Sequence, residues 1–201
     1  MLKPLNVLRV ILLSFVIVSC QKDIDNTAAA ADITGTWNFI SIDAKTSNTQ
    51  QTADETDVFK TITVNDYVTE KNSGTIIFDG AKMTANNLLY SINTLAKSSI
   101  YENGTLTDTV SEQINFTVPS LSGAAPYKKI SADSLYFESG SFFTSGSTSQ
   151  STQKPGGVKL KLENDKLYLI QSAMQSATET NDGAITTSDF KGTIIINLQR
   201  Q

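Results

Sequence analysis

The chain has 201 residues, a formal net charge of −4, one cysteine and no histidine. Histidine is the most frequent general base and metal ligand in proteins, so its absence excludes a His-activated nucleophile and a His-bound zinc. A single cysteine excludes a disulfide within the chain, and a modestly acidic chain without a basic stripe argues against nucleic acid as a partner. We therefore predict a protein that is not an enzyme and uses neither a metal nor a cofactor.

The start of the chain has the organisation of a secretory signal. Lys3 and Arg9 form a short cationic region, and residues 10–18 are apolar except for Ser14. This run is too short to cross a bilayer, which takes about 20 helical residues. Its length and its flanking residues therefore favour a signal peptide over a transmembrane helix.

The apolar run ends in Ile17-Val18-Ser19-Cys20, which resembles the lipobox of bacterial lipoproteins. The resemblance implies that residues 1–19 are a lipoprotein signal peptide and that a diacylglycerol is attached to the sulfur of Cys20. Two acyl chains anchor a protein stably, whereas one does so only marginally. Residues 20–32 are polar or alanine-rich and are predicted to form a flexible tether. The alternative, a chance cysteine at the end of a core helix, fits this polar continuation poorly.

The tether begins with Gln21-Lys22-Asp23-Ile24-Asp25. A basic residue followed by acidic residues directly after the lipidated cysteine resembles the surface-export signal of Bacteroidota lipoproteins. The resemblance implies an outer membrane lipoprotein that is exposed on the cell surface. A plain solvated tether, with the protein facing the periplasm, is the alternative.

Residues 33–201 are predicted to form a single domain of short strands. In the first strand, Trp37 and Phe39 share one phase and Ile40 and Ile42 share the other, so we expect a bend or bulge near Phe39. Turn signals and β-branched runs predict the following strands. They cover residues 58–64, 74–78, 83–95, 105–118, 134–143 and 192–200, and polar loops are predicted at residues 46–56, 144–157 and 173–188.

Residues 158–170 predict a hairpin with a defined register. A two-residue turn at Asn164-Asp165 pairs Glu163 with Lys166. This register places four leucines on one face and the charged pair on the other, so turn chemistry and burial pattern agree. The four are Leu160, Leu162, Leu167 and Leu169.

Eight or more strands without a helical block predict an all-β fold. Gly35-Thr36-Trp37 at the start of the first strand resembles the G-x-W motif of lipocalin-type barrels. The order of lipobox, tether and G-x-W is similar to that of lipocalin-like lipoproteins of Bacteroidota. The resemblance implies an antiparallel up-and-down barrel of about eight to ten strands, in which Arg200 from the last strand covers Trp37. A β-sandwich is the alternative fold.

Four residues are candidates for contact with a ligand, namely Tyr90, Glu112, Phe116 and Tyr136. Strict alternation over residues 109–118 places Glu112 on the apolar face of its strand. A carboxylate there either projects into a cavity or is moved outward by a bulge. The bulge or a rim position is favoured, because burying an unpaired charge costs several kcal/mol.

The sequence thus predicts a monomeric, membrane-anchored exported lipoprotein that binds a small apolar or amphipathic ligand in a β-barrel. The alternative is a structural or interaction protein, a β-sandwich that presents Ser/Thr-rich loops to a partner or a glycan. An apolar-lined cavity with an open mouth would favour the first prediction, and two packed sheets with a filled core would favour the second.

Overall fold

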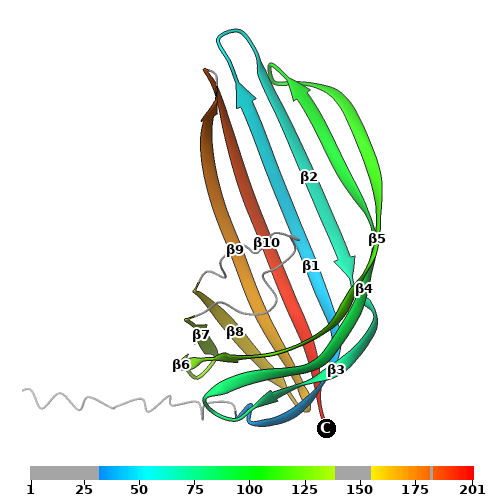
Figure 1. The fold of residues 1–201 in the computed structure, drawn as a ribbon, viewed down its shortest axis with the longest axis vertical. Helices are drawn as coiled ribbons and strands as arrows, with labels where there is room; N and C mark the ends of the chain where they lie inside the picture. Colours follow the sequence, from blue (N-terminus) through cyan, green and yellow to red (C-terminus); the bar gives the residue numbers. More distant parts are fainter. Residues whose placement is uncertain (1–31, 139–154, 182) are drawn as a thin grey trace, which may run out of the picture.

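The computed structural model describes residues 32–138, 155–181 and 183–201. Cys20, the predicted signal peptide and most of the predicted loop at residues 144–157 lie outside these ranges. The described chain folds into ten antiparallel strands in one sheet (Figure 1) and contains no helix long and apolar enough to span a membrane. The strands are β1 (Gly35–Ala53), β2 (Val58–Val68), β3 (Glu70–Phe78), β4 (Lys82–Glu102), β5 (Thr105–Pro126), β6 (Lys128–Ser131), β7 (Ser134–Phe137), β8 (Gly156–Glu163), β9 (Lys166–Asn181) and β10 (Ala184–Arg200).

The sheet closes on itself at the end that carries the C-terminus, the lower end in Figure 1. β10 returns to pair with β1, and β3 pairs with both β1 and β4. β5 pairs with β4, and after Tyr127 the same stretch of chain continues as β6 and pairs with β7. Since β7, β8, β9 and β10 pair in sequence, the hydrogen-bonded ring is complete. The predicted all-β, antiparallel, up-and-down barrel is confirmed.

β2 and β3 together occupy one strand position of the ring. β2 pairs with the upper parts of β1 and β4, and β3 pairs with their lower parts. Thr69 lies between them and is buried. Its backbone N–H donates to the Ile42 carbonyl at 3.0 Å, and its hydroxyl accepts a 2.8 Å hydrogen bond from the Ile42 N–H. These two bonds pair the backbone of Ile42 at the interruption.

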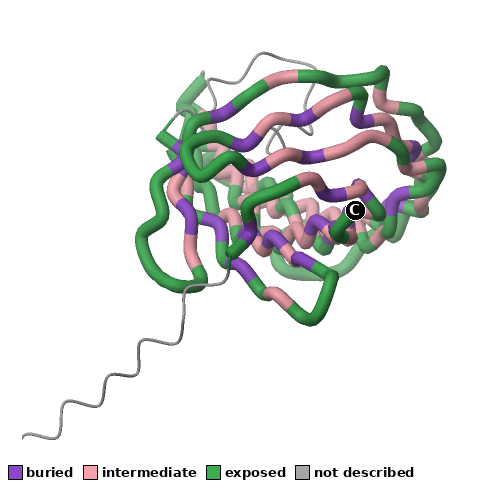
Figure 2. The backbone as a smooth tube through the Cα atoms, turned by 90° about the horizontal axis from the view of Figure 1, so that it is seen from below, coloured by how far each residue is buried: buried purple, intermediate pink, exposed green. Residues whose placement is uncertain are grey.

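The closed ring is filled by its own side chains. Buried residues alternate with exposed ones along the strands (Figure 2), as expected for a sheet with one face inside. The rings of Phe78, Tyr127 and Phe137 pack in succession, with centroid separations of 5.9 and 6.0 Å. The hydrophobic side chains with at most 1% exposure come from six strands, and they are Trp37, Ala44, Ile76, Phe78, Met83, Ala85, Leu88, Leu135, Phe137, Leu167 and Leu198.

Trp37 and Arg200 connect the first strand of the domain, β1, with its last strand, β10. The Arg200 guanidinium carbon lies 4.5 Å from the centroid of the fully buried Trp37 ring, so the last strand covers this tryptophan as predicted. The Trp37 indole N–H donates to the Ile33 carbonyl at 2.8 Å, and Arg200 donates to the Asp32 carbonyl at 2.9 Å. Gly35 has a φ of 123°, a region that other residues rarely adopt, which explains the glycine two residues before the tryptophan.

Above the ring, six strands continue upward as an open sheet in the order β9, β10, β1, β2, β4, β5 (Figure 1). Two of the predicted loops, residues 46–56 and 173–188, prove to be mostly strand. β1 extends to Ala53, β9 extends to Asn181 and β10 begins at Ala184. Thr, Ser and Gln occupy both faces of these segments, so no hydrophobic alternation marks them. Pairing on both sides of β1 and β10 and the β-branched threonines stabilise the strands instead.

Asn103 joins two hairpin turns at the upper end. It adopts a φ of 50° in the Asn103-Gly104 turn between β4 and β5. Its backbone N–H donates to the Val58 carbonyl at 2.9 Å, and its side-chain oxygen accepts from the Val58 N–H at 2.9 Å. Its side-chain amide also donates to Asp57 at 2.9 Å, so the β1–β2 and β4–β5 turns are held together.

Two local predictions are confirmed in detail. The β8–β9 hairpin has the predicted register, with Glu163 opposite Lys166 and Leu160 opposite Leu169. The register of β1 against β10 shifts just after Phe39, which leaves Ile40 as the extra residue at 48% exposure.

The hairpin register predicts a clear order of mutational effects. Leu160→Ala and Leu169→Ala should each lower the free energy of unfolding by about 2–5 kcal/mol, because both side chains are in the core. Lys159→Ala, on the opposite face, should change it by no more than about 0.5 kcal/mol. Urea denaturation of the lipid-free domain measures all three, and the reverse order would mean that the strand faces are assigned incorrectly.

The Trp37–Arg200 contact predicts a smaller effect. Arg200→Ala should lower the free energy of unfolding by about 1–2 kcal/mol, because it removes an exposed cation–π contact and a hydrogen bond. Arg200→Lys should restore part of this loss, since it keeps the charge without the planar group. Fluorescence of Trp37, the single tryptophan, reports unfolding directly. Equal stability of the wild type and the alanine variant would contradict the contact.

Candidate ligand-binding site

The pairing register assigns the two faces of the open sheet. Ile196 is buried in the ring, and the β10 register continues without a shift up to Ala184, so alternate residues such as Phe190 share the inner face. Tyr90 packs on the core, and the β4–β5 register is regular from there to Ile100. Residues in phase with these therefore form one continuous inner face.

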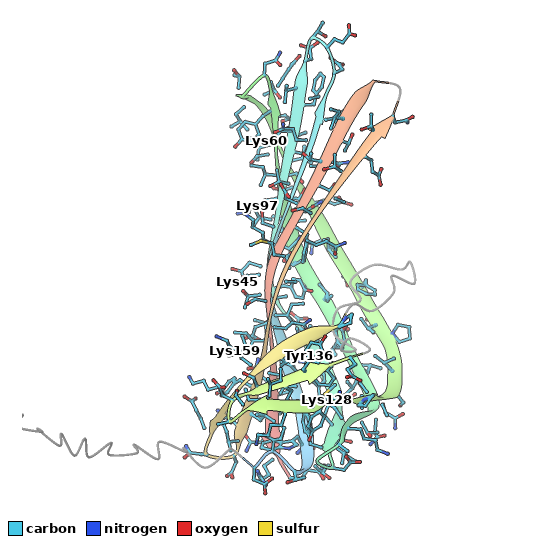
Figure 3. The ribbon with its side chains drawn as sticks, turned by 90° about the vertical axis from the view of Figure 1, so that its left-hand side faces the viewer. Lys45, Lys60, Lys97, Lys128, Tyr136 and Lys159 are labelled. Atoms are coloured by element: carbon cyan, nitrogen blue, oxygen red, sulfur yellow. The ribbon has the colours of Figure 1, made fainter. Side chains whose placement is uncertain are left out.

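Three of the four predicted site residues lie on this inner face. Tyr90 is opposite Val118, and Phe116 and Glu112 follow further up β5. Tyr136 does not join them. It pairs with Lys128 on β6, while its neighbours Leu135 and Phe137 point into the core, so Tyr136 faces outward (Figure 3). The prediction that all four residues line one site is therefore corrected for Tyr136.

Glu112 occupies the inner face without a bulge. It lies opposite Ala96, and the pairing of β4 with β5 is regular on both sides of it. Of the two alternatives that the sequence favoured, a bulge or a rim position, the bulge is thus absent here. The residue is nevertheless exposed, because β5 is the last strand of the open sheet. A charge at this place costs little, since it remains in contact with water.

An apolar band runs along the inner face of β4 and β5. Phe116 lies opposite Ile92 and is 48% exposed, and Val110 further up is 45% exposed. Ile114 lies between them in the same phase and is half-buried. Large apolar side chains at these exposures on adjacent positions form a patch of the kind that contacts a ligand or a partner.

Two tyrosines form the floor of this face, where the open sheet meets the filled ring. Tyr67 and Tyr90 are half-buried and pack on the core, and the Tyr90 ring lies 6.0 Å from that of Phe39 in an edge-on arrangement. Burial raises the pKa of both phenols, so both are neutral near pH 7. They offer hydroxyl groups beside an apolar surface, an arrangement suited to an amphipathic molecule.

Phe190 contributes an aromatic ring on the wall opposite β5. A side chain added at Gly192 would meet this ring at 3.2 Å, so the ring lies over the glycine, beside Thr46 of β1. Sequence reasoning missed Tyr67 and Phe190. The predicted strand at residues 58–64 ended before Tyr67, and the predicted strand at residues 192–200 began after Phe190. Extending the first strand by three residues and the second by two would have included them.

The two faces of the open sheet carry opposite charge. The inner face holds four acidic residues and no lysine or arginine. The acids are Glu102, Asp108, Glu112 and Glu179. The outer face holds the four lysines Lys45, Lys60, Lys97 and Lys191, three of which are labelled along one side of the sheet in Figure 3. Asp66 and Asp189 also lie on the outer face, and Lys45 pairs with Asp66 at 3.3 Å.

A hollow of about 510 Å³ lies across β2, β1, β10 and β9. Its charged and large apolar side chains come from the outer face, and they are Lys45, Val64, Asp66, Met174 and Lys191. The sequence placed the ligand inside the barrel, yet this hollow is outside it and the ring is filled. The inner face above the ring is therefore the part of the interior that a ligand can reach.

Within residues 32–138, 155–181 and 183–201, no three acidic or cysteine side chains are grouped to hold a metal ion. Comparisons of the chain with protein-family models, with curated proteins and with solved structures find no match. The geometry of the inner face is thus the basis for inferring a function.

Proposed function

We propose that the protein is an exported, membrane-anchored lipoprotein of lipocalin type that binds a small apolar or amphipathic molecule on the inner face of its open sheet. The exposed apolar band of β4 and β5, which includes Phe116, carries this proposal. Covering apolar surface stabilises a complex by about 25 cal/mol per Å² removed from water. The neutral phenols of Tyr67 and Tyr90 supply hydrogen-bonding groups at the base of the band.

The position of Asp32, the first residue that the structure describes, supports the membrane anchor. Asp32 lies beside Arg200 at the lower end of the barrel, so the tether leaves the domain there. Twelve residues, 21–32, separate Cys20 from this point. Fully extended they reach about 40 Å, which lets the barrel stand clear of a bilayer with its open end pointing away. The contact of Trp37 with Arg200 supports the lipocalin-type assignment in the same region.

The second candidate function is an interaction protein that binds another polypeptide. The observation that favours it is the pair of long strands, β5 and β9, that border the open sheet. An exposed strand edge presents unpaired N–H and C=O groups, which other chains can bind. A small ligand would bind the inner face alone, whereas a polypeptide would also pair with the backbone of the edge.

The apolar band predicts binding of a neutral hydrophobic probe. N-phenyl-1-naphthylamine should bind the lipid-free domain with increased fluorescence, and Phe116→Ala should weaken this binding about tenfold or more. Tyr136→Ala is the matched control, because it removes an aromatic side chain from the outer face, and it should leave binding unchanged. Glu112→Gln should preserve folding stability to within about 0.5 kcal/mol, since the side chain is exposed. Equal loss of binding in the Phe116 and Tyr136 variants would contradict the proposed site.

The anchor predicts a distinct result in cells. Cys20→Ala should abolish labelling with radioactive palmitate and release the protein from membranes or leave its signal uncleaved. Ser19→Ala, which keeps a small residue before the cysteine, should be processed normally. Protease treatment of intact cells then reports which side of the membrane the barrel faces. A Cys20→Ala protein that remained on membranes at the mature mass would exclude lipidation at this residue.

A further inference from the structure

The outer edge of β5 is unpaired over a long stretch of the described chain. Between Thr105 and Val118, β5 pairs with β4 on one side, and no described strand pairs with its other side. The pairing with β4 is regular from Asp108 to Val118, so no bulge twists this part of the edge away from an incoming strand, and the nearest register shifts lie at its two ends. Its backbone is therefore available for a further row of hydrogen bonds.

The sequence of this edge has only one of the usual protections against strand pairing, the inward-pointing charges of Asp108 and Glu112. Natural proteins cover exposed edges or interrupt them with lysine, proline or a bulge. Residues 105–118 contain no lysine, arginine or proline, and half of them are the β-branched residues Thr, Val and Ile. Such a segment favours an extended partner strand.

The closed ring shows how many strands the open part lacks. At the lower end, β7 and β8 lie between β6 and β9. β7 ends at Phe137, and β8 pairs with β9 only as far as Ile170. Above this level the places of these two strands are not filled by any described residue, and β5 and β9 form the two borders of the opening.

The charge of the upper half indicates which polypeptide fits this edge. The inner face beside the edge carries Asp108 and Glu112 on β5, with Glu179 on β9, and no basic residue. We propose that the β5 edge binds an extended peptide segment of another protein that alternates apolar and small polar residues and carries a lysine or arginine opposite Glu112. The added strand continues the sheet by β-augmentation.

The register specifies the side chains of the added strand. Its inward residues lie beside Val110, Ile114 and Phe116, where apolar side chains cover surface that is now exposed. One inward residue faces Glu112 and is basic in the proposed partner, because an opposite-charge pair across two strands stabilises a sheet and a like-charge pair destabilises it. Outward residues lie beside Thr109 and its polar successors, so they are small and polar. This proposal does not depend on the small-molecule ligand.

A second copy of this chain fits the edge less well. Two β5 edges that pair antiparallel turn one copy upside down and place the two tethers at opposite ends of the pair. β1 alone spans 19 residues, or about 60 Å, whereas both lipid anchors must enter the same membrane. Pairing of β5 with β9 of another copy keeps both upright but brings together edges that carry acids and no bases. A partner with a basic residue meets neither problem.

The test uses a synthetic peptide in which Val alternates with Thr and a single Lys replaces the Val that faces Glu112. Fluorescence anisotropy should show binding to the lipid-free domain, with at least a tenfold loss when the peptide Lys is replaced by Glu. Glu112→Lys should reverse this preference, so that the variant binds the Glu peptide at least tenfold more tightly than the Lys peptide. Glu55→Lys, an exposed charge change in the β1–β2 turn, should retain the wild-type preference.

Backbone pairing is tested separately. N-methylation of the peptide amides that face β5 should abolish binding, because it removes the hydrogen bonds and leaves the side chains. Equal binding of the methylated peptide, or the same charge preference in the wild type and Glu112→Lys, would overturn the proposal. Analytical ultracentrifugation that shows a stable dimer unable to bind the peptide would overturn it too, because a second copy would then occupy the edge.

Discussion

The stretch of chain that forms β5 and β6 changes its neighbouring strand near Tyr127. There it leaves β4 and joins β7, and this one transfer closes the ring below. Above it, β5 has a neighbouring strand on one side only among the described residues, and the sheet that these residues form is open. Closure removes the strand edges from the lower half and concentrates the apolar core there. The upper half extends the same strands without that core.

This division assigns stability to the closed lower ring and the proposed recognition to the open upper sheet. The lower ring contains the buried aromatic and aliphatic side chains together with the Trp37–Arg200 contact, and it supplies the scaffold. The upper sheet exposes an apolar band on β4 and β5, acids on its inner face and lysines on its outer face. Sites of recognition are commonly carried by the less stable parts of a rigid scaffold. Asp32, where the proposed membrane tether would begin, lies at the opposite end beside Arg200.

The parts of the fold that sequence reasoning predicted correctly combine two signals. At Asn164-Asp165, turn chemistry and leucine alternation agree, and near Phe39 a phase change in an aromatic strand marks the bulge. The polar strands at residues 46–56 and 173–188 could not be predicted, because Thr, Ser and Gln on both faces leave no period to detect. The outward orientation of Tyr136 depends on its register with β6, and the exposure of Glu112 depends on the missing neighbour of β5. Neither is a property of the local sequence.

Hydrogen exchange resolved at single amides along β5 tests most directly whether the barrel is closed below and open above. In the lipid-free monomer, amides of residues 109–117 that face β4 should be protected, and those that face the open edge should exchange rapidly. Residues 97–100 of β4, which pair with β2 and β5, should be protected without alternation. Uniform protection of every amide in residues 109–117 would contradict the account, because it would mean that another part of the chain covers the β5 edge.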